Sequence, residues 1–78
     1  MMPMDRKNEK RQSFKRLANK RVNRVLKDLR LIGNLSNTQN YTYTDSDAKL
    51  ILGAIEKEIN LVKSRFNVAL SKKRSIKI

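Results

Sequence analysis

The sequence predicts an all-α protein: an antiparallel helical hairpin, in which a polar loop joins two long helices. Apolar residues recur every three or four positions along two segments of similar length, as they do on the buried side of a helix. A glycine ends the first segment, and a Thr-Asp-Ser-Asp motif opens the second. The 78 residues allow one domain, 1–78. The single β-prone stretch, Tyr41-Thr42-Tyr43, is too short to found a sheet.

The first helix is expected over residues 5–32. It begins after Pro3, which is tolerated at a helix start, and Asp5 suits the positive end of the helix dipole. Its apolar stripe lies at Ala18, Val22, Val25, Leu29 and Ile32. These alternating steps of four and three residues are typical of a packed helix pair. Gly33 follows directly, so we expect it to end the helix in a left-handed conformation.

The loop is expected over residues 33–43, which are polar, uncharged and rich in Asn. The second helix follows over residues 44–70. Thr44 stands three residues before Asp47, which resembles a capping box with Asp in place of Glu. The apolar stripe of this helix lies at Ala48, Leu52, Ile55, Ile59, Val62, Phe66 and Ala69. Gly53 lies in the interior of this helix and is compatible with the close approach of another helix.

Two helices bury only one face each, which is a small core for a chain without disulfides. Phe14 lies one helical step before the first stripe and Phe66 lies on the second, so both are expected in the core. Additional burial requires a partner. Two hairpins forming a four-helix bundle, as a homo-oligomer, is the leading architecture, and a hairpin docked on another protein is the alternative.

The residue types exclude several kinds of function. Without Cys or His the chain has no ligands for a structural zinc or iron–sulfur site, and no Ser/His or Cys/His catalysis. It has no Gly-rich phosphate loop, and Asp45 and Asp47 are better explained by helix capping than by catalysis. We therefore expect a non-enzymatic protein without cofactor or metal. No segment is apolar enough to span a bilayer or to act as a signal peptide, so a soluble, cytoplasmic protein is expected.

Positive charge is concentrated in two parts of the chain. The formal net charge is +12. Residues 1–32 carry 11 Lys and Arg against 3 Asp and Glu, and the tail 71–78 carries 4 and none. Residues 44–70 are neutral, with 4 of each sign. Because a surface of one sign repels itself unless a polyanion compensates it, the first helix and the tail are expected to bind nucleic acid. The alternative is a basic, solvated surface.

The candidate phosphate-binding residues are Lys10, Arg11, Lys15, Arg16, Lys20, Arg21, Arg24, Lys27, Lys72, Lys73 and Arg74. Four of them fall on one side of a helix, away from the apolar stripe: Arg16, Lys20, Arg24 and Lys27. Asn19 and Asn23 lie among them and could pair with adenine, although ordinary surface residues are the simpler interpretation. Tyr41 and Tyr43 could stack on exposed bases, or they could close the open end of a small core.

Two resemblances bear on function. A basic segment, a helix, a polar loop and a second helix resemble the layout of basic helix–loop–helix proteins, but the Glu and paired Arg of that family are absent. The segment from Arg21 to Asn37, followed by Asn40-Tyr41 and Thr44-Asp45, is similar to small uncharacterised bacterial proteins, often of plasmids or phages. This similarity covers about residues 17–66. It implies a compact module with a specific loop, and no particular activity.

Three functions follow from these observations. The first is a nucleic-acid-binding protein, for DNA or RNA, whose first helix and tail contact phosphates. The second is an accessory subunit or regulator of a larger nucleic-acid enzyme of a mobile element, on which the apolar stripes or the loop dock. The third, a membrane-surface peptide, is disfavoured because the first stripe lacks Trp and the second stripe offers a better partner.

Overall fold

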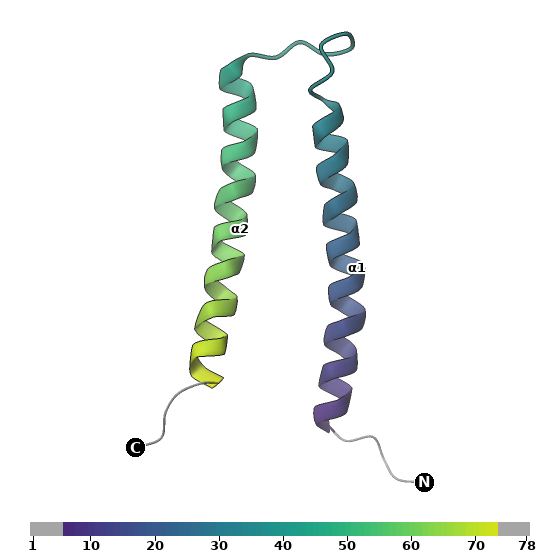
Figure 1. The fold of residues 1–78 in the computed structure, drawn as a ribbon, viewed down its shortest axis with the longest axis vertical. Coiled ribbons are helices and arrows are strands. Elements are labelled where there is room, and N and C mark those ends of the chain that lie inside the picture. The colour runs from purple at the N-terminus through teal and green to yellow at the C-terminus, as the bar shows by residue number, and fades with distance from the viewer. Residues whose placement is uncertain (1–5, 74–78) are drawn as a thin grey trace. The chain divides into compact units, whose positions relative to one another are not determined.

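The computed structural model describes residues 6–73, which form two α-helices and no strand (Figure 1). Helix α1 spans Arg6–Asn34 and helix α2 spans Asp45–Lys73, with 29 residues in each. A polar segment joins them. The chain divides into two units between Tyr41 and Thr42, so α1 with most of the loop is one unit and α2 is the other. The all-α class and the two long helices are thereby confirmed.

The end of α1 differs from the prediction at Gly33. The helix continues through Gly33 to Asn34, and no residue between 6 and 73 has a positive φ. Three backbone hydrogen bonds of the i→i−3 type close the last turn instead. Leu35 N–H donates to the Ile32 carbonyl over 3.0 Å, and the next two N–H groups along the chain repeat the pattern over 3.1 and 3.3 Å. Because these bonds satisfy the terminal carbonyls, the helix ends without a left-handed residue.

The loop after α1 is organised around Asn37. Its backbone carbonyl accepts hydrogen bonds from the N–H groups of Asn40, over 3.2 Å, and Tyr41, over 3.0 Å. Its side-chain Oδ1 accepts a third from the N–H of Gln39 over 3.0 Å, which is an Asx turn. Three bonds to one residue give residues 37–41 a defined turn conformation.

The predicted capping box at the start of α2 is confirmed. Thr44 Oγ1 accepts a hydrogen bond from the N–H of Asp47, and Asp47 Oδ2 accepts one from the N–H of Thr44, each over 3.0 Å. The Thr44 carbonyl accepts the first intrahelical bond, from Ala48 N–H over 3.1 Å. At its other end α2 reaches Lys73, three residues beyond the predicted end, so Lys72 belongs to the helix rather than to a tail.

Neither helix by itself buries a side chain among residues 6–72. The least exposed side chains of α1 and α2 lie on or beside the predicted stripes: Leu17, Ala18, Leu29, Ile32, Ala48 and Ile55. Phe14 and Phe66, which were expected in a core, remain 51% and 53% exposed. The reason is geometric, because one helix can shield a side chain only with its own neighbouring turns. The apolar stripes therefore need a partner to be covered.

Candidate nucleic-acid interface

Helix α1 carries a dense and almost unopposed positive charge. Its 29 residues include 11 Lys and Arg, whereas its acidic residues are Glu9 and Asp28 alone. All of these cationic side chains are exposed. With so few carboxylates on the same helix, the field of α1 is positive along most of its length, which is about 43 Å at 1.5 Å per residue.

The strongest part of this surface is a set of four residues that we call the basic row: Arg16, Lys20, Arg24 and Lys27. At about 100° per residue, the four lie within an arc of about 80° and extend about 16 Å along α1. None of them forms an ion pair or a side-chain hydrogen bond with another residue between 6 and 73. Four cationic heads are thus available to a ligand on one side of the helix.

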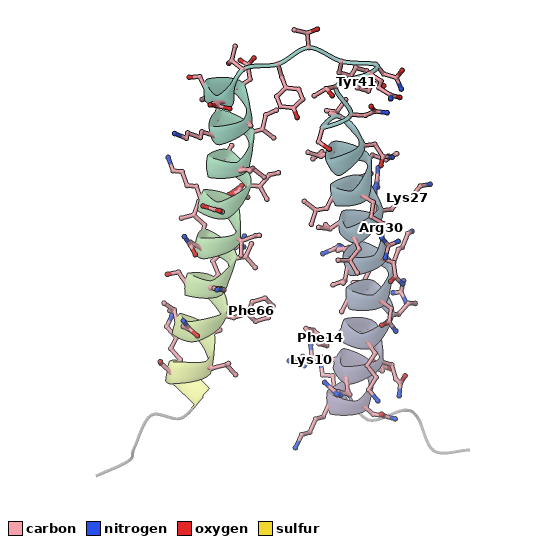
Figure 2. All side chains as sticks on the ribbon, turned by 45° about the horizontal axis from the view of Figure 1, so that its top comes forward. Lys10, Phe14, Lys27, Arg30, Tyr41 and Phe66 are labelled. Carbon is pink, nitrogen blue, oxygen red and sulfur yellow. The ribbon has the colours of Figure 1, made fainter. Side chains whose placement is uncertain are left out.

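The basic row lies on the side of α1 opposite to its apolar stripe. Figure 2 shows the two sides directly, because Lys27 and Phe14 leave the helix in opposite directions. A partner that covered the stripe would therefore leave the basic row exposed. This separation of an apolar side from a cationic side is what a helix needs to pack and to bind a polyanion at once.

The other predicted phosphate-binding residues of α1 do not share this side. Lys10 lies between the basic row and the apolar stripe and leaves the helix on the side of Phe14 (Figure 2), and Lys15 and Arg21 flank the apolar stripe. Arg11 lies on the stripe side, where its guanidinium carbon is 5.8 Å from the centre of the Phe14 ring. This distance fits a cation–π contact. The eight predicted contacts on α1 therefore do not form one surface, and Arg11 has an alternative partner within its own helix.

Asn23 lies within the side of α1 that carries the basic row. It lies three residues after Lys20 and four residues before Lys27, so the three side chains are neighbours on the helix surface. Asn19 lies further round, at the edge of this side. Both Asn side chains are exposed. Their placement is compatible with contacts to a bound nucleic acid, as predicted, and equally with ordinary surface positions.

The two tyrosines belong to different units of the chain. Tyr41 ends the turn that is organised by Asn37, and Tyr43 precedes the cap of α2. Both rings are about half exposed. Neither is therefore fully packed against its own unit, and the stacking prediction stays a prediction.

The C-terminal candidates are only partly within the described residues. Lys72 is exposed in the last turn of α2, where a cation also interacts favourably with the helix dipole. Lys73 ends the helix, and its side chain lies outside the described part, as does Arg74. The expected contribution of these residues to phosphate binding stays a prediction.

Two features of the exposed surface were not among the predicted site residues. Around the axis of α1, Arg30 lies between Asn19 and Asn23, next to the basic row. The helical spacing of the cations was sufficient to find it. The second feature is a set of three exposed apolar side chains on α2, outside its predicted stripe: Leu50, Leu61 and Val68. A count of apolar residues on each side of α2, rather than along its predicted apolar stripe alone, would have found this set.

Other kinds of site have little support in the described residues. Between residues 6 and 73 no three His, Cys, Asp or Glu side chains are grouped so that they could hold a metal ion. Neither α1 nor α2, over the same range, is long and apolar enough to cross a membrane. Compared with known proteins, the chain matches no family model, no curated protein and no solved structure. The resemblance to small plasmid and phage proteins therefore stays a prediction.

Proposed function

We propose that the protein is a non-enzymatic nucleic-acid-binding protein that contacts phosphates through the basic row of α1. The observation that carries this proposal is the placement of Arg16, Lys20, Arg24 and Lys27 on one exposed side, without ion-pair partners in the described chain. Phosphate contacts of this kind supply affinity without sequence preference. Lys72 and the basic residues after it add charge to the same polyanion.

The architecture that accompanies this proposal is an antiparallel hairpin. The stripes of α1 and α2 have matching steps of four and three residues, and their members are exposed or half-buried when each helix is considered alone. Mutual packing of the two stripes covers both of them and leaves the basic row on the outside. A four-helix bundle of two hairpins, or docking on a partner protein, provides the remaining burial.

The proposal is tested by fluorescence anisotropy with duplex DNA, single-stranded DNA and RNA over a series of salt concentrations. Four phosphate contacts to duplex DNA predict a slope of about −3.6 for log K against log salt, since each contributes about −0.9. Reversal of two members of the row, Lys20→Glu with Arg24→Glu, is expected to weaken binding to all sequences alike. A slope near zero, or unchanged affinity of this variant, would contradict the proposal.

A matched control separates the basic row from net charge alone. Lys49→Glu with Lys63→Glu makes the same change in net charge on α2, where both side chains are exposed, Lys49 away from the apolar stripe and Lys63 at its edge. We expect a much smaller loss of affinity in this control. Equal losses in both variants would show that binding follows the overall charge of the chain and not the basic row.

A second function is favoured by the exposed stripes themselves. Each helix presents large apolar side chains that it does not cover, including Val22 and Val25 on α1 and Ile59 and Val62 on α2. Exposed apolar surface of this kind marks a protein-interaction site. In this alternative the protein is an accessory subunit of a larger nucleic-acid enzyme, and its charge assists. Binding to nucleic acid that vanishes by physiological salt would favour this alternative over the first.

A further inference from the structure

Helix α2 carries a second set of apolar side chains, apart from its predicted apolar stripe, which we call its main stripe. Leu50, Leu61 and Val68 are 73%, 52% and 54% exposed, and Leu50 is the most exposed of the large apolar side chains described. On a helix that turns about 100° per residue, the three lie within about 20° of one another, with Ala54 beside them. They are rotated by about 135° from the centre of the main stripe. Pairing of the two main stripes leaves this set uncovered.

Four charged residues on the same side of α2 are ordered by sign, and a fifth, Lys57, lies just outside them, about 20° from Leu50 and Val68. Asp47 and Glu58 lie in its N-terminal half, and Arg65 and Lys72 lie in its C-terminal half. We call these four residues, together with Leu50, Ala54, Leu61 and Val68, the second face. All eight fall within an arc of about 80°. The second face is therefore apolar along its length, acidic towards one end and basic towards the other.

This order of charges makes the second face complementary to itself when two copies run in opposite directions. An antiparallel pair brings Asp47 opposite Lys72 and Glu58 opposite Arg65 of the other copy. Two residues lie directly opposite one another when the midpoint between their positions on α2 coincides with the two-fold axis. The midpoints of these two charged pairs, and the midpoint of Leu50 with Val68, differ by at most three residues, or about 4 Å along the helix. Long Arg and Lys side chains span such an offset. A parallel pair would instead place each charged residue beside the same residue of the other copy, and these like charges repel.

We propose that a second copy of this chain covers the second face, with the two α2 helices antiparallel about a two-fold axis. A closed two-fold contact uses the same surface on both copies, and this surface meets that condition in both its apolar and its charged residues. Leu61, near the centre, meets its own copy. The inference rests on the proposed pairing of the main stripes, which occupies the other side of α2, and it does not depend on nucleic-acid binding.

The test uses charge exchange in the full chain, read by light scattering at several protein concentrations. Wild-type protein is expected to have the mass of two chains. Glu58→Arg and Arg65→Glu each place like charges opposite one another, so each variant is expected to dissociate at concentrations at least tenfold higher than wild type. The double variant, which carries both substitutions, exchanges the two charges and is expected to recover the wild-type dimer. An equimolar mixture of the two single variants is expected to form a heterodimer.

The controls keep the result independent of folding and of nucleic-acid binding. Lys63→Glu makes the same change in net charge as Arg65→Glu on the opposite side of α2, and it is expected to leave the dimer intact. Circular dichroism checks that each variant stays helical. A monomeric wild type, single variants that dimerise as wild type does, or a helical double variant that stays monomeric would overturn the proposal. Anisotropy with duplex DNA, measured on the double variant, reports the function of the basic row separately because the net charge is unchanged.

Discussion

Thr44 and Asp47 fix the beginning of α2 by two reciprocal hydrogen bonds, each 3.0 Å long. The Thr44 hydroxyl accepts from the Asp47 N–H, and the Asp47 carboxylate accepts from the Thr44 N–H. Both N–H groups would otherwise lack a partner within the helix. The negative charge of Asp47 also lies at the positive end of the helix dipole. The cap therefore sets where α2 begins, independently of what covers its sides.

Removal of the Thr44 hydroxyl is expected to destabilise α2. The substitution Thr44→Ala leaves the Asp47 N–H without its acceptor, at a cost of about 1 kcal/mol in the free energy of unfolding. Thr44→Ser retains a hydroxyl and is the matched control. Urea unfolding followed by circular dichroism measures both variants. Equal stability of Thr44→Ala and Thr44→Ser would show that this hydrogen bond does not contribute.

Local chemistry explains which parts of the fold the sequence could predict. The cap of α2 depends on residues three positions apart, so Thr44 and Asp47 were sufficient to find it. The two helices follow in the same way from the spacing of apolar side chains. Gly33 was predicted wrongly because a glycine can end a helix in more than one way. Here the i→i−3 bonds of Leu35 and its two successors close the last turn without a left-handed residue.

The site was less predictable than the helices because it depends on directions around a helix. The number of cations in α1 indicated a polyanion, but only their angles separate the basic row from Arg11, which contacts Phe14. The second face of α2 was missed for the same reason, since Leu50, Leu61 and Val68 are widely spaced along the sequence. Residues that share a face at intervals of 7 and 11 are less conspicuous than a stripe with steps of three and four.

Replacement of Gly33 by alanine is expected to stabilise the protein. Gly33 has no positive φ, and a Cβ added there would meet no atom within 4 Å. Alanine restricts the unfolded chain and favours the helix, so we expect a gain of about 0.5 to 1 kcal/mol in the free energy of unfolding. Thermal unfolding measures the change. A loss of stability would instead indicate a left-handed Gly33.

Gly53 provides an internal comparison in the middle of α2. It also lacks a positive φ, and a Cβ there would meet no atom within 4 Å in its own unit of the chain. It lies on neither the main stripe nor the second face. Gly53→Ala is therefore expected to raise the free energy of unfolding by about 1 kcal/mol. Destabilisation at this position would reveal a helix packed against Gly53.

Two arginines of α1 are expected to differ in their contribution to binding. Arg24 belongs to the basic row, whereas Arg11 lies over the Phe14 ring at 5.8 Å on the side of the apolar stripe. Arg24→Gln is expected to reduce the magnitude of the salt slope on duplex DNA by about 0.9, the value for one phosphate. Arg11→Gln removes the same charge and is expected to change the slope by less. Equal changes would show that the side of the helix does not matter.

A single charge on the main stripe of α2 is expected to unfold the protein if α1 covers that stripe. Ile55 is among the least exposed side chains of α2, and burial of a carboxylate there without a partner costs several kcal/mol. A core of this size supplies only about 3 to 5 kcal/mol in total, so Ile55→Asp is expected to abolish cooperative thermal unfolding. Asn60→Asp introduces the same side chain at an exposed position away from both apolar sides of α2 and is expected to unfold as wild type does. A cooperative Ile55→Asp variant with wild-type stability would mean that the main stripe is not the surface on which the helices pack.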